Sequence, residues 1–399
     1  MTPQLRFPAF TDEWQVRKLA DLSKRISDGI HSTPKYDEGG KYYFINGNNF
    51  VNNKIMIFKS TKKVSSIEFD KYKIAMGPHT ILMSINGTIG SLARYSNEPV
   101  MLGKSACYIN LKKNVATDFI YNKIQTQIIK NYFEGQLTGS TIKNLSLKTI
   151  KDTSIPIPTI AEQEKIAEFL TALDERVALQ DKKVELLQKY KKSVMQKIFS
   201  QKIRFKDESG NNYPDWKEKK LNEIGAVIGG GTPDTSNLAY WGGVVRWLTP
   251  TEVKSRFITK SKKSITEAGL KHSSAKMLPV GAIIFTSRAT VGDIAISKVP
   301  LATNQGFQSI VVLDDNDSRY IYYWMIVNKN VFLRKASGST FPEISSSEMK
   351  KINIQLPCIE EQKKIYSLLT LCDDKIDIEK TKLIEAKKFK KALLQRMFV

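Results

Sequence analysis

The chain has 399 residues, enough for two or three domains of about 100–200 residues each. Hydrophobic residues make up 41% and charged residues 26% of the sequence, a balance that excludes wholesale disorder. Lysine and arginine number 62 against 40 aspartates and glutamates, so the formal net charge is +22. A folded chain with this excess of positive charge is expected to bind a polyanion.

Other composition features narrow the class of protein further. Three cysteines are too few for a disulfide framework, so we expect a reducing, cytoplasmic location. The sequence has no run of about 18 apolar residues, so we expect no membrane-spanning helix and no membrane partner. The first ten residues lack the apolar core of a signal peptide. The three histidines are far apart in sequence, so no metal site is expected.

The sequence contains two copies of one unit. Residues 158–199 align without a gap with residues 357–398, and each segment begins with the pattern Pro-x-x-x-Glu-Gln-x-x-Ile. Upstream, the similarity continues at a drifting offset, and both copies open with Arg-Phe followed by a tryptophan. Each copy is therefore expected to consist of a variable globular part and a better conserved long helix. The predicted domains are 1–157, 158–200, 201–356 and 357–399.

Short strands followed by polar loops are predicted in the first globular part. Residues 42–45 and 81–85 have the apolar character of strands, and each run leads into a loop rich in asparagine, serine and threonine. Such side chains hydrogen-bond to base edges and phosphates. The candidate DNA-binding residues here are Asn46, Asn48, Asn49, Ser84, Asn86 and Thr88, with Lys62 and Lys63 as basic neighbours.

A long helix is predicted to follow from about residue 159. Thr159 and Glu162 have the spacing of a capping box, and Pro158 precedes them. Apolar residues then recur at alternating spacings of four and three, which is typical of a coiled coil. The candidate seam residues are Ile166, Leu170, Leu173, Val177 and Leu187, interrupted by polar residues at Gln180 and Lys191.

The second globular part repeats the strand-and-loop pattern with different side chains. The strand near 245–248 leads into Thr249-Pro-Thr251-Glu252, and the strand at 283–286 leads into Ser287-Arg288. Different loops on a shared framework are expected to read different half-sites. The candidate DNA-binding residues are Arg246, Thr249, Thr251, Thr286, Arg288 and Thr290, with Lys262 and Lys263. Any single one of these residues is equally well explained as an ordinary strand or turn residue.

The second helix carries a matching seam, with Ile365, Leu369, Ile376, Leu383 and Leu393 as its apolar members. Its polar interruptions, Glu379 and Lys390, fall at the same two places as in the first helix. We therefore expect the two helices to pair antiparallel as a coiled-coil spacer related by a pseudo-twofold. A helix of about 37 residues is roughly 55 Å long, or about 16 base pairs of B-DNA. The alternative is that each helix packs only on its own domain.

Of the net charge of +22, +18 lies outside the two helices. Basic residues cluster at matching places in both globular parts: Lys54, Lys59, Lys62 and Lys63 in the first, and Lys254, Arg256, Lys260, Lys262 and Lys263 in the second. A run of charge is often only a solvated surface, but its repetition favours contact with a polyanion. We therefore expect the globular parts to bind the partner and the helices to act as a spacer.

No motif in the sequence indicates catalysis. Gly103-Lys104-Ser105 resembles the end of a phosphate-binding loop, but Glu98 stands where the first glycine belongs. Residues 233–254 match a loose metal-dependent nuclease pattern that has no counterpart in the first copy. We find no S-adenosylmethionine loop and no nucleophile–histidine pair. The sequence therefore predicts no catalytic residues, no metal site and no cofactor.

The order of these parts resembles the specificity subunit of type I restriction–modification systems. The resemblance covers essentially the whole chain and is carried by the two Pro-x-x-x-Glu-Gln helix starts, the Arg-Phe…Trp openings and the Gly-Ser-Thr triplets at 139–141 and 338–340. One departure is Gln355, where the first copy has Pro156.

The resemblance implies an α+β fold with two target-recognition domains, each reading one half of a bipartite asymmetric site in double-stranded DNA. It further implies that the paired helices set the gap and bind two methyltransferase subunits, to which motor–nuclease subunits add. S-adenosylmethionine, ATP and magnesium would then be used by those partners only. Two other interpretations of the sequence are a fused restriction enzyme, which would require catalytic motifs, and a basic coiled-coil adaptor for RNA or another acidic partner.

Overall fold

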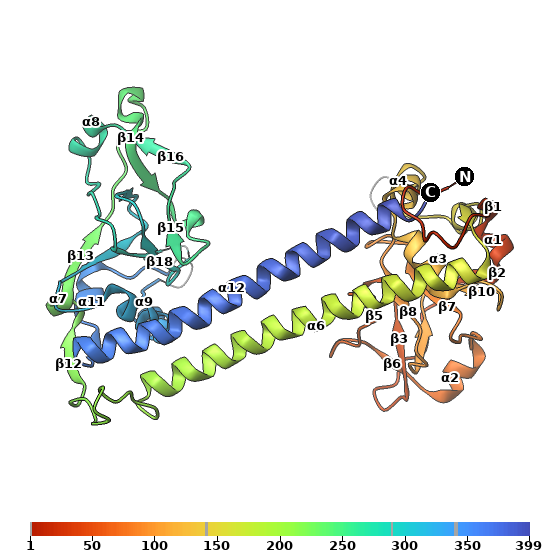
Figure 1. Cartoon of the computed structure of the whole chain (residues 1–399), viewed down its shortest axis with the longest axis horizontal. Coiled ribbons are helices and arrows are strands. Elements are labelled where there is room, and N and C mark those ends of the chain that lie inside the picture. The colour runs from red at the N-terminus through yellow and green to blue at the C-terminus, as the bar shows by residue number, and fades with distance from the viewer. Residues whose placement is uncertain (1, 140–142, 289, 339–341) are drawn as a thin grey trace. The chain divides into compact units, whose positions relative to one another are not determined.

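The computed structural model describes residues 2–139, 143–288, 290–338 and 342–399. The serine and threonine of both Gly-Ser-Thr triplets, residues 140–141 and 339–340, lie outside these ranges. The chain divides into two compact units (Figure 1). Unit 1 comprises Met1–Lys182 with Thr381–Val399, and unit 2 comprises Lys183–Lys380. Each unit therefore combines a globular part with portions of both long helices, a grouping that chain order alone does not suggest.

The elements of the first half follow one another in this order: β1 (Gln15–Lys18), α1 (Leu19–Leu22), β2 (Ser23–Asp28), β3 (Tyr42–Ile45), η1 (Gly47–Asn49), β4 (Phe50–Val51), β5 (Lys54–Ile55), β6 (Lys63–Val64), α2 (Ser66–Lys71), β7 (Thr80–Ser84), β8 (Leu92–Arg94), β9 (Val100–Leu102), β10 (Ala106–Leu111), α3 (Thr117–Ile124), α4 (Gln127–Gly135), α5 (Leu147–Lys151), β11 (Ser154–Ile157) and α6 (Ile160–Phe199).

The second half repeats this order closely: β12 (Lys217–Lys220), α7 (Leu221–Ile224), β13 (Gly225–Gly229), η2 (Leu238–Tyr240), β14 (Trp241–Leu248), η3 (Pro250–Glu252), β15 (Phe257–Ile258), β16 (Lys263–Ile265), α8 (Glu267–Lys271), β17 (Ile283–Phe285), β18 (Ile294–Ser297), β19 (Ala302–Thr303), β20 (Gln308–Val312), α9 (Ser318–Val327), α10 (Lys329–Lys335), α11 (Ser346–Lys350), β21 (Asn353–Leu356) and α12 (Ile359–Arg396).

The sheets of the two units have matching strand orders, and the main sheet of unit 2 has one additional strand, β15. The main sheet of unit 1 has the order β2-β10-β7-β8, and that of unit 2 has β13-β20-β17-β18-β15. A smaller three-stranded sheet, β6-β3-β9 in unit 1 and β16-β14-β19 in unit 2, contains one antiparallel and one parallel pair. The central strands β7 and β10 are buried on both faces. Their sequences are therefore mostly apolar along their length and do not alternate between apolar and polar residues. The predicted α+β class and the internal repeat are thus confirmed.

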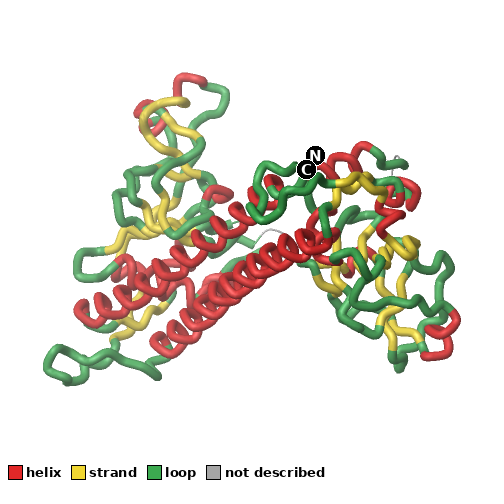
Figure 2. The backbone as a smooth tube through the Cα atoms, turned by 45° about the vertical axis from the view of Figure 1, so that its right-hand side comes forward, coloured by secondary structure: helices red, strands yellow, loops and turns green. Residues whose placement is uncertain are grey.

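Each core is built from a sheet, a short helix and the ends of both long helices (Figure 2). In unit 1, Phe119 of α3 packs with Leu170 near the start of α6 and with Phe398 just beyond α12. In unit 2, Tyr320 of α9 packs with Ile365 of α12 and with Phe199 at the end of α6. Each long helix therefore begins in the core of one unit and ends in the core of the other. The chain ends accordingly lie together, as expected, and the Leu5 amide donates to the Arg396 carbonyl at 2.9 Å (Figure 1).

Within each unit the portions of α6 and α12 run antiparallel, as predicted. In unit 1, Asp174 pairs with Lys390 and Asp181 with Lys387. In unit 2, Lys183 pairs with Glu379, and Lys191 with Asp373 at 2.5 Å. The polar interruptions at Lys191, Glu379 and Lys390 therefore form ion pairs between the helices. Because Asp174 and Lys191 align with Asp373 and Lys390 in the repeat, the two units make the same pair with the roles of the helices exchanged.

Seven of the ten predicted seam residues are buried, namely Ile166, Leu170, Ile365, Leu369, Ile376, Leu383 and Leu393. The other three, Leu173, Val177 and Leu187, are half-buried. Several of the buried ones, including Ile166 and Ile365, belong to the globular cores as well as to the helix pair. The alternative that each helix packs only on its own domain is therefore wrong, because the helices contact each other and each contributes its last residues to the other unit's core.

Buried glutamates at the helix starts join each helix to the opening of its unit. The Arg6 guanidinium donates from Nε to Glu162 Oε1 at 2.8 Å and from Nη2 to Oε2 at 2.7 Å, and the Trp14 indole also donates to Oε1. Arg204 and Trp216 bind Glu361 in the same way. The hydrogen bond to Glu162 raises the pKa of Arg6, which reflects a charge-assisted contact. We expected Glu162 to cap its helix, but its carboxylate binds Arg6 and Trp14.

The glutamine after each glutamate links the start of the long helix to the segment that precedes α3 or α9. Gln163 accepts from the Ala116 amide at 3.1 Å and donates to the Pro158 carbonyl at 2.9 Å. Gln362 accepts from the Asp317 amide and donates to the Pro357 carbonyl. Ala116 and Asp317 immediately precede α3 and α9. The Glu-Gln pair thus positions both the opening segment and the helix that covers the main sheet.

We expect Glu162→Gln to lower the free energy of unfolding of unit 1 by about 3 kcal/mol, because it leaves the half-buried Arg6 guanidinium without its countercharge. Glu361→Gln should do the same for unit 2. Urea unfolding, followed by tryptophan fluorescence, measures the change. Glu164→Gln, an exposed change on the same turn of α6, is the control. If it destabilises the chain as much as Glu162→Gln does, the buried ion pair has no special role.

A groove in the helix pair of unit 1 has no side chain filling it. It encloses about 320 Å³ and is lined by Leu173, Val177, Ala386 and Phe389, among others. Ala386 aligns with Leu187 in the repeat, so the smaller side chain leaves the space. We expect Ala386→Leu to stabilise the chain by about 1 kcal/mol and Leu187→Ala to destabilise it by about 2 kcal/mol. Calorimetry on both variants checks this, and a lower melting temperature for Ala386→Leu would contradict it.

Candidate nucleic-acid interface

Three loops meet at the end of β3 and β7 in unit 1. The Gly47 amide donates to Ser105 Oγ at 3.0 Å, and Ser105 Oγ donates to Asn46 Oδ1 at 2.9 Å. Thr88 Oγ1 donates to the Gly47 carbonyl at 3.4 Å. A Cβ on Gly47 would lie 2.5 Å from Ser84 Cβ, so only glycine allows this close packing. The two loops predicted to bind DNA therefore form one surface.

Unit 2 builds the same surface from different side chains. The Ser287 amide donates to the Gly306 carbonyl at 2.8 Å, just as the Ile85 amide donates to the Ser105 carbonyl at 3.0 Å in unit 1. Thr249 Oγ1 donates to Glu252 Oε2 at 2.7 Å and holds the η3 turn closed. The backbone framework is thus repeated while the side chains that it presents differ.

The loop after β7 and the loop after β17 are held by the same kind of hydrogen bond. Ser84 Oγ donates to the Thr88 carbonyl, and Thr286 Oγ1 donates to the Thr290 carbonyl at 2.5 Å. The loops close with glycines of positive φ, +80° at Gly90 and +87° at Gly292, which lie in the region that favours glycine. A hydroxyl at the strand end therefore holds each loop from inside.

The sixteen predicted DNA-binding residues fall into three groups according to the exposure of each residue to solvent. Eight of them are exposed, namely Asn48, Lys62, Thr88, Arg246, Thr251, Lys262, Lys263 and Thr290. Five are half-buried: Asn46, Lys63, Asn86, Thr249 and Arg288. The remaining three, Asn49, Ser84 and Thr286, are buried. Asn49 donates to the Met56 carbonyl at 2.8 Å and accepts from the Asn46 amide at 3.0 Å, so it shapes the η1 turn.

Lys63 and Lys263 lie on strands β6 and β16, which pair with β3 and β14, the strands that lead into the first of the predicted DNA-binding loops in each unit. Lys63 of β6 pairs with Tyr43 of β3, and its ammonium lies 5.4 Å from the ring centroid. Lys263 of β16 pairs with Trp247 of β14 and lies 5.6 Å from the Trp241 ring. Aromatic contact orients these ammonium groups beside the loops. The predicted lysines and loop residues are thus brought together in both units.

Clefts beside the loops contain polar residues that the sequence analysis missed. The cleft of unit 1 encloses about 850 Å³ and is lined by Asn52, Asn53, Gln125, Lys130 and Lys143 together with Thr88 and Gly90. The corresponding cleft of unit 2 encloses about 520 Å³ and includes Lys254, Arg256, Gly292 and Lys329. Asn52 and Asn53 continue the asparagine-rich run from 46, a signal that the sequence offered. Gln125 and Lys130 lie in the segment of α3 and α4, far from the loops in sequence, and no sequence pattern indicated that they belong to this cleft.

One member of the predicted basic clusters has a different environment. Arg256 forms ion pairs with Asp373 and Asp374 of α12, so its charge is already neutralised within unit 2. The other basic residues of that cluster, Lys254, Lys260, Lys262 and Lys263, are exposed. The residue type alone did not show that Arg256 forms ion pairs while the lysines of its cluster are exposed.

The three cysteine thiols are less acidic than an exposed thiol. Burial raises the pKa of the Cys107, Cys358 and Cys372 thiols, which disfavours the nucleophilic thiolate. In the part of the chain that the structure covers, no group of three or more histidine, cysteine, aspartate or glutamate side chains could hold a metal ion. Nor does any helix within the same ranges have the length and apolarity needed to cross a membrane.

Comparison with known proteins agrees with this geometry. The family model "Type I restriction modification DNA specificity domain" matches residues 11–189 and 213–388, one match for each half. The type I restriction enzyme MjaIX specificity subunit of Methanocaldococcus jannaschii is 38% identical over 50% of this chain and 46% of its own length. The putative MjaX specificity subunit of the same organism is 27% identical over 96% of this chain and 92% of its own length.

A solved structure shows the same fold. The type I restriction–modification S subunit from M. genitalium matches with a TM-score of 0.60 at 20% identity, over 100% of this chain and 99% of that one. The repeated loops, the paired long helices and the two family matches lead to one conclusion: the chain belongs to the family of type I restriction–modification specificity subunits, which are non-catalytic and carry no cofactor of their own.

Proposed function

We propose that this chain reads a bipartite, asymmetric site in double-stranded DNA, with one half-site read by each unit. The observation that carries the proposal is the repeated three-loop surface, which has one backbone framework in both units and different side chains on each. A shared framework with different side chains recognises different base sequences through the donors and acceptors in the major groove.

The exposed and half-buried loop residues are proposed to contact DNA. Asn86 and Arg288 occupy the loops after β7 and β17, and asparagine and arginine pair with adenine and guanine respectively. Lys62, Lys63, Lys262 and Lys263 are proposed to contact phosphates. The buried residues Asn49, Ser84 and Thr286 are proposed to act by holding the loop conformations. The clefts add Asn52, Asn53, Gln125 and Lys130 to the candidate surface in unit 1.

The long helices are proposed to set the gap between half-sites and to bind two methyltransferase subunits, to which motor–nuclease subunits add. This proposal uses the domain limits 1–157, 158–200, 201–356 and 357–399. Exposed apolar side chains along the helices support a docking role, including Leu179 at 72% and Leu371 at 68% exposure. S-adenosylmethionine, ATP and magnesium would be used by those partners. The protein would act in the cytoplasm, where its DNA lies.

We expect Arg288→Ala to relax specificity at one position of one half-site and Asn86→Ala to do so in the other half-site. Losing one good base contact should reduce discrimination at that position by about tenfold or more. Methylation of a library of randomised half-sites, by the complex with its modification subunit, measures this. Lys62→Ala and Lys263→Ala are the matched controls and should weaken binding to all sequences about equally. Unchanged preferences in both loop variants would refute the loop assignment.

Lengthening both helices should widen the gap. Four residues inserted after Lys182 and four after Lys380 fall at the two places where the chain passes between units, so every ion pair described within a unit is kept. Four residues add about 6 Å of helix, so we expect the gap to grow by about one or two base pairs. The methylated motif reports the gap directly. A folded double insertion that methylates the original gap would show that the helices do not set it.

A further inference from the structure

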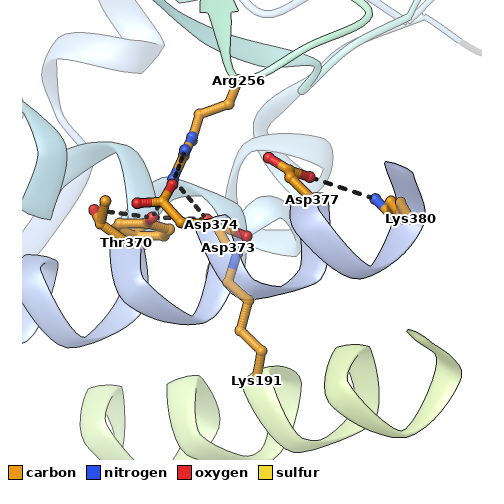
Figure 3. Close-up of polar contacts among 8 residues, drawn as sticks. Lys191, Arg256, Thr370, Asp373, Asp374, Asp377 and Lys380 are labelled. Carbon is orange, nitrogen blue, oxygen red and sulfur yellow. Dashed lines mark hydrogen bonds and ion pairs between the residues drawn. The ribbon is translucent and has the colours of Figure 1, made fainter. Parts of the chain in front are cut away.

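Arg256 joins the recognition surface of unit 2 to the long helix α12 (Figure 3). Its Nη2 lies 2.7 Å from Asp374 Oδ1 and its Nη1 lies 3.4 Å from Asp373 Oδ2. Nη1 also donates to the Tyr323 hydroxyl at 3.4 Å. One guanidinium therefore contacts two consecutive carboxylates of α12 and a tyrosine of α9, a geometry that the compact charge of lysine does not reproduce.

Asp373 is the centre of this network (Figure 3). Its Oδ2 accepts from the Tyr323 hydroxyl at 2.7 Å, and its Oδ1 accepts from Lys191 of α6 at 2.5 Å. The Arg256, Asp373 and Lys191 side chains are only 17%, 18% and 15% exposed, so water weakens these contacts less than at the surface. Burial lowers the pKa of Arg256, but hydrogen bonds to Asp374 and Tyr323 outweigh it and leave the pKa raised.

Arg256 belongs to the wall of the recognition cleft. It lies between the η3 turn, which presents Thr249 and Thr251, and strand β15, and its carbonyl accepts from the Ile296 amide of β18 at 2.9 Å. Together with Lys254 and Gly292 it lines the cleft of unit 2. The segment that contains Arg256 follows directly after the η3 turn. The ion pairs therefore hold this segment against the long helix α12.

Unit 1 keeps the helix side of this network but not the domain side. Thr171, Asp174 and Lys390 align with Thr370, Asp373 and Lys191. Asn122 stands where unit 2 has Tyr323, and its side chain is too short to replace the phenol. The aligned atoms Asn122 Oδ1, Thr171 Oγ1 and Asp174 Oδ2 are buried and have no hydrogen-bond partner among the residues that the structure describes. The fastening is thus a feature of unit 2.

We propose that Arg256 is a positioning residue for target reading: its ion pairs with Asp373 and Asp374 hold the cleft wall and the η3 reading loop of unit 2 in a fixed orientation on α12. The inference rests on the proposed function, because it assigns a role within DNA reading. It predicts that unit 2 discriminates bases more stringently with this fastening than without it, and that reading by unit 1 does not depend on Arg256.

The test is a double-mutant cycle with Arg256→Gln, Asp374→Asn and the double variant. Asp374 is 52% exposed, so its replacement should leave the chain folded. Each full-length variant is assembled with the modification subunit. Methylation rates are then measured on DNA with the correct site, with single base changes in either half-site, and with the gap changed by one base pair. Lys254→Gln is the control, because it removes an equal charge from the same cleft and leaves the network intact.

We expect both single variants and the double variant to lose about tenfold in discrimination in the half-site read by unit 2, with no further loss in the double variant. All three should also tolerate the altered gap, while discrimination in the other half-site stays unchanged. Lys254→Gln should slow methylation of all sites alike. If Arg256→Gln acts but Asp374→Asn does not, Arg256 contacts DNA itself and the proposal is wrong. A lower melting temperature with unchanged discrimination also overturns it. If the unmodified chain directs no methylation at all, the proposed function fails instead.

Discussion

The buried glutamate at the start of each long helix is the contact on which the rest of the structure depends. Glu162 and Glu361 are fully buried, and each is neutralised by an arginine and accepts a hydrogen bond from an indole, both about 150 residues earlier in the chain. A buried carboxylate is tolerated only with such partners, so the opening of the unit must return to the helix start. The adjacent glutamine then fastens the helix that covers the main sheet. The glutamate and the glutamine at each helix start thereby attach the globular part to its long helix.

The exchange of helix ends follows from this arrangement. A helix that begins on the glutamate of one unit contributes its last apolar residues, such as Phe199 or Phe398, to the core of the other. Neither half of the chain can therefore complete its core from its own residues in sequence order. The repeated ion pairs, Asp174 with Lys390 and Lys191 with Asp373, give the helix pair a defined register in each unit. The proposed role of the helix pair in setting the spacing between half-sites depends on this register.

The repeat and the helices were predictable because they depend on local periodicity. Apolar spacing predicted α6 and α12, and polar residues at matching seam positions predicted the defined register that Lys191 and Lys390 provide. The partners of Glu162 were not predictable, since a capping box and a distant ion pair use the same residue type. The loops were located but their details were not: Ser84 and Asn49 have groups suited to DNA, yet loop conformation turns them inward. Arg256 shows the same limit, because its charge says nothing about Asp374 more than a hundred residues later.

The central claim is that two repeated surfaces read two halves of one DNA site. The most direct test is a genome-wide map of methylated adenine in cells that contain the modification subunit, with and without this chain. The account predicts one motif that depends on the chain and consists of two short specified halves around a gap of fixed length. Methylation that does not depend on the chain, or a single uninterrupted motif, would contradict it and would favour a basic adaptor for RNA or another acidic partner.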